Sequence, residues 1–198
     1  MKKSIMLIAA MCMTSVMTFA QDIIRVSTDK TDLVMKVSPK GRLYQVYLGD
    51  KFLNPADYNN LKWDVYAASD GAVSQRGHEV YATSGAEDYF EPAVAVTHAD
   101  GNMTTYLYYQ SSEQKAVKGG TETVITLKDK VYPLTVKLHY VAYAKENVIK
   151  AWSEISHKEK SPITLWRYSS TMLYFKSNKY FLTNYHSDWA KEGQPETT

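Results

Sequence analysis

Cysteine is almost absent from this chain of 198 residues. Its single cysteine, Cys12, lies in an apolar run near the N-terminus, and none follows it. The rest of the chain therefore cannot form a disulfide or a cysteine-ligated metal site. The five histidines do not fall at metal-ligand spacing either; they are His78, His98, His139, His157 and His186. We therefore expect a domain that is held together by its hydrophobic core, with no metal ion and no cofactor.

An excess of charge of either sign is also missing. Lysine and arginine number 23 and aspartate and glutamate 21, and Lys2 and Lys3 belong to an N-terminal leader that contains no acidic residue. Setting these two lysines aside leaves 21 basic residues against 21 acidic ones. Nucleic-acid binding depends on a basic patch that neutralises phosphates, so that class of function is disfavoured. The sequence also has no glycine-rich phosphate loop and no heptad repeat, which argues against nucleotide binding and a coiled coil.

The sequence has no hydrophobic run of the length that spans a bilayer, about 20 apolar residues. The run from Ile5 to Val16 is shorter; it follows Lys2 and Lys3 and leads to Thr18-Phe19-Ala20. A basic start, a short apolar stretch and small residues at the end are typical of a secretory signal peptide. We predict that residues 1–20 are a signal peptide, that the mature protein is exported to the periplasm or the medium, and that it keeps no membrane segment. A permanent N-terminal anchor is the alternative.

Aromatic residues, in contrast, are abundant, with 16 Tyr, 5 Phe and 4 Trp. Alternating apolar and polar residues recur in short segments, which is typical of half-buried β-strands. Over residues 134–140, for example, Leu134, Val136, Leu138 and Tyr140 fall on one face. No segment keeps a helical period over three turns. The pattern predicts one all-β domain, residues 21–198, with the architecture of an antiparallel sandwich.

Two hairpins are predicted from local turn signals. Segments 32–37 and 43–48 flank Ser38-Pro39-Lys40-Gly41, a sequence that suits a tight turn. Segments 93–98 and 103–109 flank Asp100-Gly101, whose glycine readily takes the positive φ of a hairpin turn.

The rest of the chain is predicted to alternate between loops and strands. Residues 49–77 lack periodicity and are expected to form a long loop with a functional or docking role. Residues 111–120 are polar and are expected to be an exposed connection. Further strands are expected at 121–127, 134–140, 148–156, 163–175 and 180–185, with the segments 148–156 and 163–175 paired to each other.

Three carboxylates, Glu87, Asp88 and Glu91, precede Pro92 in a turn-rich loop. A retaining glycosidase needs two carboxyl groups about 5 to 5.5 Å apart, but Asp and Glu in such loops commonly accept bonds from nearby backbone donors. We therefore interpret the three as structural, and His98 and His139 likewise. Trp189 lies in a polar segment beyond the last expected strand, where it has no obvious core to enter, so a ligand-facing role is favoured over a packing role.

The segment 79–105 also carries a family pattern. It contains Tyr81-x-x-x-Gly85-x-x-Asp88-Tyr89-x-x-Pro92-Ala93, followed by His98-Ala99-Asp100-Gly101. This order resembles the N-terminal domain of glycoside hydrolase family 36, the family of retaining α-galactosidases. The resemblance continues at Leu138-x-Tyr140-x-Ala142-Tyr143, Glu146-Asn147-Val148-Ile149 and Trp189-Ala190-Lys191-Glu192.

The resemblance implies a β-supersandwich of two large curved sheets, with a galactose-mutarotase-like architecture. Family members follow this domain with a (β/α)8 barrel that holds an aspartate nucleophile and an aspartate general acid/base. Such a barrel takes about 250 residues, and none remain after Thr198. The expectation is therefore the N-terminal domain of an exported α-galactosidase that lacks the catalytic residues. Alone it should be inactive towards terminal α-linked galactose in oligosaccharides.

The resemblance also implies substrate-binding residues. The tryptophan of the Trp-Ala-Lys-Glu motif lines the galactose pocket in the family, so Trp189 takes that role. An acidic residue of the long N-terminal loop and an arginine about a dozen residues later also reach the substrate, in some members from a neighbouring subunit. Asp64 and Arg76 match that spacing. The implied partners are an α-galactoside, the catalytic barrel and a second copy in a homo-oligomer.

Two alternatives belong to other classes of function. The aromatic content and the signal peptide also suit a stand-alone carbohydrate-binding sandwich, which would bind galactosides without any barrel. A purely structural exported module would bind no sugar. A mutarotase-like activity would need a histidine and a carboxylate that converge on one concave face.

Overall fold

The computed structural model describes residues 23–62, 78–85, 91–175, 179, 181–187, 189–190 and 192–198. The predicted signal peptide lies outside these ranges, as do Asp64, Arg76, Glu87 and Asp88. In the part of the chain that is described, no helix has the length and apolar character needed to cross a membrane.

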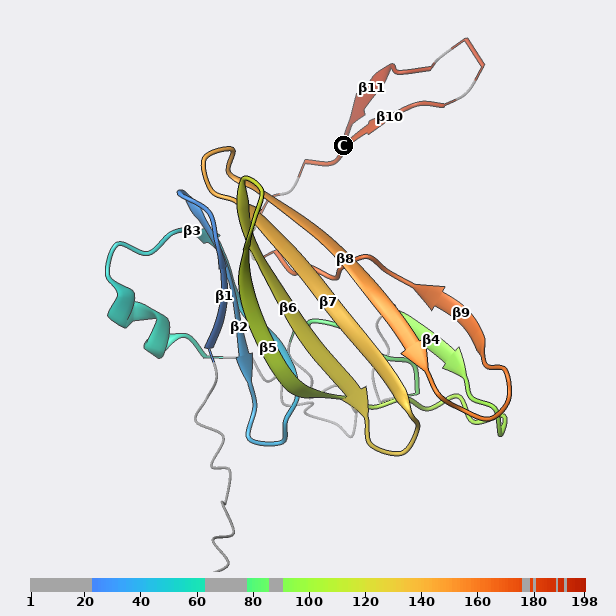
Figure 1. The fold of residues 1–198 in the computed structure, drawn as a ribbon. Helices are drawn as coiled ribbons and strands as arrows, with labels where there is room; N and C mark the ends of the chain where they lie inside the picture. Colours follow the sequence, from blue (N-terminus) through green and yellow to red (C-terminus); the bar gives the residue numbers. More distant parts are fainter. Residues whose placement is uncertain are drawn as a thin grey trace, which may run out of the picture.

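The described chain is almost entirely β-structure with antiparallel sheets, which confirms the predicted fold class (Figure 1). The first sheet has the order β1-β2-β3, with β1 at Ile23–Ser27, β2 at Thr31–Val37 and β3 at Leu43–Asp50. The second has the order β5-β6-β7-β8; its strands are β5 (Leu107–Val117), β6 (Gly120–Asp129), β7 (Leu134–Tyr143) and β8 (Val148–His157). These two sheets carry most of the core.

Smaller elements flank the two sheets. Strand β4 (Val94–Thr97) pairs with β9 (Thr164–Tyr168), and β10 (Thr183–Tyr185) pairs with β11 (Pro195–Thr197) in a hairpin that projects away from the sheets (Figure 1). A short 3-10 helix, η1 (Pro55–Asn60), follows β3. Asn54 caps it by accepting a hydrogen bond from the Ala56 amide at 3.0 Å, and Pro55 suits its first turn.

The core forms where the inward faces of the sheets meet. The four residues that alternation assigned to one face are all buried, which confirms that prediction: Leu134, Val136, Leu138 and Tyr140. They pack with side chains of β1 to β6 and with Val80, Tyr81 and Ala93. Alternation places apolar residues on one face of each strand, so burying that face holds the sheets together without a disulfide.

The hairpin predicted around Ser38–Gly41 is confirmed, and Gly41 takes a φ of +78° in its turn. The hairpin predicted around Asp100-Gly101 is wrong. The turn itself forms, since the Gly101 amide donates to the His98 carbonyl at 2.9 Å. The strands on either side then separate, because β4 pairs with β9 and β5 pairs with β6.

The polar connection predicted at residues 111–120 is also wrong, because β5 continues to Val117 and turns through Gly119, at φ +80°, into β6. This half of β5 is exposed, so its polar side chains do not conflict with strand structure. The strand predicted over 163–175 is limited to Thr164–Tyr168, and it pairs with β4 instead of β8. Strand β1 was missed.

Candidate functional site

Large exposed hydrophobic side chains are concentrated in the C-terminal part of the described chain. Nine of the thirteen lie between Leu165 and Trp189. Five of these come from β9 and the segment that follows it, and we call them the apolar surface: Leu165, Trp166, Tyr168, Leu173 and Phe175. The other four, Phe181, Leu182, Tyr185 and Trp189, belong to the C-terminal hairpin, residues 181–198. Large exposed apolar patches on proteins commonly mark interaction sites.

The apolar surface is held in place by hydrogen bonds to the body of the domain. The Gln45 side chain donates to the Tyr174 carbonyl at 2.6 Å and accepts from the Tyr174 amide at 3.1 Å. The Tyr174 hydroxyl donates to the Glu79 carbonyl at 3.1 Å, and the Tyr81 hydroxyl donates to the Ser169 carbonyl at 2.8 Å. These bonds fix both ends of the segment 169–174, so the exposed side chains stand on an anchored backbone.

Strand β9 is anchored by polar contacts of its own. The Trp166 indole donates to the Thr97 hydroxyl at 2.8 Å, which fixes an otherwise exposed ring. Arg167 forms an ion pair with Glu91. Glu91 therefore has a structural partner, in agreement with its interpretation from the sequence. The neighbouring Glu87 and Asp88 lie outside the described residues.

Trp189 lies in the turn between β10 and β11, with 92% of its surface exposed. The next residue, Ala190, has a φ of +65°, and Gly193 has a φ of +73°. The turn is closed by the Gly193 amide, which donates to the His186 carbonyl at 3.0 Å. The indole is thus outside the core and set apart from the sheets. Asp64 and Arg76, the other two predicted site residues, lie outside the described residues.

His98 is buried in a network of contacts that links the β4–β5, β6–β7 and β8–β9 loops. Its Nδ1 lies 2.8 Å from Glu159 Oε1 and its Nε2 lies 2.9 Å from the Thr105 hydroxyl, while the Tyr132 ring stacks on it at 3.5 Å. Glu159 also accepts from the Ala99 amide at 2.9 Å. Burial acts to raise the pKa of Glu159, but the bonds from Ala99 and His98 outweigh it and leave the pKa below its usual range. With both ring nitrogens occupied, His98 serves as a structural clamp.

His139 is paired in a similar way on the outer face of the second sheet. Its Nδ1 lies 2.8 Å from Glu122 Oε1, and its ring stacks on Trp152 at 4.6 Å. The hydrogen bonds from His139 and then Lys115 lower the pKa of Glu122. The structural interpretation of His139 from the sequence is supported by these contacts.

The buried tyrosines are unsuited to proton transfer at neutral pH. Burial raises the pKa of Tyr140 to about 12, and it raises the pKa of Tyr81 as well. Their hydroxyls stay protonated and serve as hydrogen-bond groups. Within the described ranges, no three histidine, cysteine, aspartate or glutamate side chains gather closely enough to hold a metal ion.

The family model for the glycosyl hydrolase family 36 N-terminal domain matches residues 41–198. The chain belongs to this family. The matched range contains β3 to β11, the apolar surface and the C-terminal hairpin, whereas β1 and β2 lie before it. A comparison with curated protein sequences finds no match.

Solved structures of family 36 enzymes have the same fold. The alpha-galactosidase from Lactobacillus brevis superposes with a TM-score of 0.75 at 21% identity, over 90% of this chain and 27% of that enzyme. The galactosidase domain of an alpha-galactosidase-sucrose kinase gives 0.76 at 22%, over 90% and 28%. A family 36 alpha-galactosidase from Geobacillus stearothermophilus gives 0.74 at 22%, over 89% and 28%. The chain thus spans little more than a quarter of the length of these relatives.

Sequence reasoning singled out Trp189 but missed the apolar surface. By sequence alone Trp166, Tyr168 and Phe175 fit an ordinary strand, since aromatic side chains are common in sheets. One signal was available: Leu165-Trp166 and Tyr168 place large side chains on both sides of a strand, which half-burial does not explain.

Proposed function

We propose that this chain is the N-terminal domain of an exported, retaining α-galactosidase, and that it supports and caps the active site of a (β/α)8 barrel. The observation that carries the proposal is the apolar surface, five large side chains left exposed on an anchored backbone. The chain belongs to family 36 and has the fold of a segment of much longer α-galactosidases. The remainder of such an enzyme is the partner that would cover the apolar surface.

In this proposal, hydrolysis of terminal α-linked galactose is carried out by aspartates of the barrel, and the domain does not hydrolyse galactosides alone. Trp189 reaches the galactose from the tip of the C-terminal hairpin, where a flat ring with 92% of its surface exposed is available for stacking. Asp64 and Arg76 would add contacts from the long loop, in the same subunit or from a second copy.

A chimera tests the docking role. The chain is joined to the remainder of the Lactobacillus brevis enzyme in place of the segment that it matches. We expect Phe175→Ser to destabilise the chimera by about 1.5–3 kcal/mol, because docking buries a phenylalanine there. The same change should reduce self-association of the isolated chain, since it removes exposed apolar area. Thermal unfolding and sedimentation velocity measure the two effects.

Val131→Ser is the matched control, because Val131 is 78% exposed and lies outside the apolar surface. It should change neither measurement. If Phe175→Ser left the chimera as stable as the parent and the isolated chain equally associated, the apolar surface would not be the docking face.

A further inference from the structure

The turn that carries Trp189 is closed by backbone bonds at one residue, His186. The His186 amide donates to the Gln194 carbonyl at 3.0 Å, and the His186 carbonyl accepts from the Gly193 amide at 3.0 Å. Trp189 follows His186 by three residues. The contacts of His186 therefore determine how the turn leaves the two strands of the C-terminal hairpin.

The His186 side chain adds a third contact at the same place. Its Nε2 lies 3.3 Å from Glu196 Oε2, which is close enough for an ion pair when the ring is protonated. Asn184 is paired with Glu196 in the register of β10 and β11, so His186, two residues after Asn184, is a diagonal neighbour of Glu196 on the same face. The side-chain pair thus ties the start of the turn to β11.

His186 also differs from the rest of the C-terminal hairpin in its burial. It is half-buried, whereas every other residue of the hairpin that the structure describes is exposed. The hairpin projects away from the sheets, and its strands pair over three residues each (Figure 1). A two-stranded hairpin of this kind is only marginally stable, so contacts at the base of its turn should control how well the turn is ordered.

We propose that His186 is a positioning residue for galactoside turnover, which holds the turn so that Trp189 is presented to the substrate. This inference rests on the proposed function, because it requires Trp189 to stack against the galactose. His186 does not contact the substrate in this proposal and acts only through Trp189.

The order of the turn is measured first, by NMR of the isolated chain. The heteronuclear NOE at the backbone amides of Trp189 and Ala190 reports fast motion of the turn. We expect His186→Ala to lower both values. Glu196→Ala should lower them by the same amount, because it breaks the same pair. His186→Gln keeps an N–H donor for Glu196 and should restore most of the parent value.

Turnover is measured next, in the chimera with the Lactobacillus brevis enzyme. An exposed pair has a small effect on an equilibrium, so His186→Ala should lower kcat/KM about twofold to fivefold. His186→Gln should restore kcat/KM, although its amide does not titrate. In the Trp189→Ala background His186→Ala should cause no further loss, because a residue that acts through Trp189 has no effect once that ring is removed.

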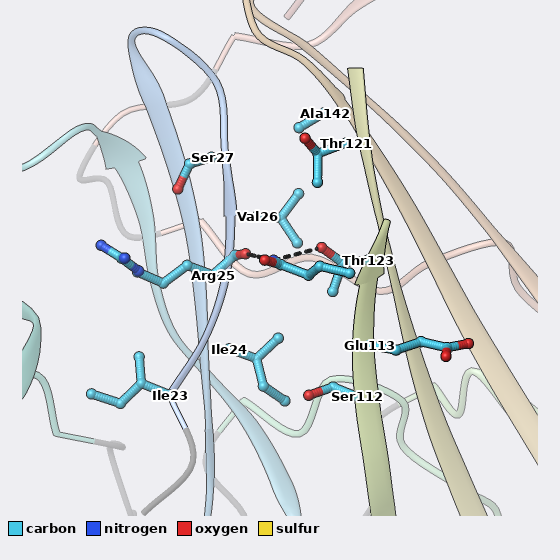
Figure 2. Close-up of a pocket in the computed structure, with 11 residues that line it drawn as sticks. Ile23, Ile24, Arg25, Val26, Ser27, Ser112, Glu113, Thr121, Thr123 and Ala142 are labelled. Atoms are coloured by element: carbon cyan, nitrogen blue, oxygen red, sulfur yellow. Dashed lines mark hydrogen bonds between the residues drawn. The ribbon is translucent and has the colours of Figure 1, made fainter. Parts of the chain in front are cut away.

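Two control variants separate positioning from a general loss of stability. Thr183→Ala removes the 2.9 Å bond to the Thr197 hydroxyl, which lies at the end of the hairpin away from the turn, and should change neither the NOE values nor kcat/KM. Gln114→Leu removes a link between the two sheets, where the Gln114 amide donates to the Arg25 carbonyl at 2.8 Å and to the Thr123 hydroxyl at 3.0 Å (Figure 2). It should lower the midpoint of urea denaturation and leave the other two quantities unchanged.

Equal NOE values in the parent and in His186→Ala would overturn the inference alone, provided that Trp189→Ala still lowers kcat/KM. An effect of His186→Ala that persists in full in the Trp189→Ala background would also overturn it, as would failure of His186→Gln to restore kcat/KM, which would indicate proton transfer by the ring. Unchanged kcat/KM in Trp189→Ala itself would contradict the proposed role of Trp189, and this inference with it. The two failures are therefore distinguishable.

Discussion

Replacing Trp189 by alanine is expected to leave the stability of this chain almost unchanged and to lower galactoside turnover in the chimera. The stability should not change because the ring is exposed. A buried Trp→Ala change costs about 3 to 5 kcal/mol, whereas Trp189 is 92% exposed. Turnover should fall because Trp189 is proposed to stack against the galactose. Loss of this stacking should reduce kcat/KM about tenfold, equivalent to about 1.4 kcal/mol.

Chemical denaturation of the isolated chain measures its stability, and steady-state kinetics of the chimera measure kcat/KM. Tyr185→Ala is the matched control, because Tyr185 lies in the same hairpin and is also exposed. It should leave both quantities near those of the parent. A large loss of stability with unaltered kinetics would mean that Trp189 is an ordinary packing residue.

The largest effect on stability is expected at a buried ion pair. Arg42 Nη2 lies 2.5 Å from Glu79 Oε1, both side chains are buried, and the guanidinium lies 5.3 Å from the centre of the Tyr108 ring. Arg42→Ala leaves the Glu79 carboxylate buried without this cation. Breaking such a pair costs about 3–5 kcal/mol, so we expect this loss in urea denaturation.

An exposed ion pair supplies the control. Arg167 pairs with Glu91, and their side chains are 48% and 76% exposed. Arg167→Ala should therefore cost at most about 1 kcal/mol. The double variant Arg42→Met, Glu79→Leu should recover most of the loss, because it leaves no unpaired charge in the core. Equal costs for Arg42→Ala and Arg167→Ala would contradict the assignment of Arg42 to a buried pair.

Local patterns predicted the elements whose partners are close in sequence. The β2–β3 hairpin is joined by a four-residue turn sequence with Pro39 and Gly41, and the inward face of β7 follows from strict alternation. Strands β4 and β9 illustrate the limit, because Val94 pairs with Tyr168, which lies 74 residues further along the chain. Alternation says which face of a strand is buried but does not say which strand lies beside it.

The same limit applies to the candidate site. Nothing near Gln45 in sequence indicates that it holds the Tyr174 backbone, so the anchored segment behind the apolar surface was not predicted. The polar residues in the second half of β5 favour a loop by sequence, although the Lys118-Gly119 turn is a usable hairpin signal.

The most direct test of this account is hydrolysis of p-nitrophenyl α-D-galactopyranoside by the isolated chain and by the chimera, measured side by side. The account predicts no turnover above the uncatalysed rate with the isolated chain. For the chimera it predicts release of nitrophenol and of galactose that keeps the α configuration. The barrel supplies both aspartates, while this domain supports and caps their site. Turnover by the isolated chain would contradict the account, as would a folded chimera that binds galactosides but does not cleave them.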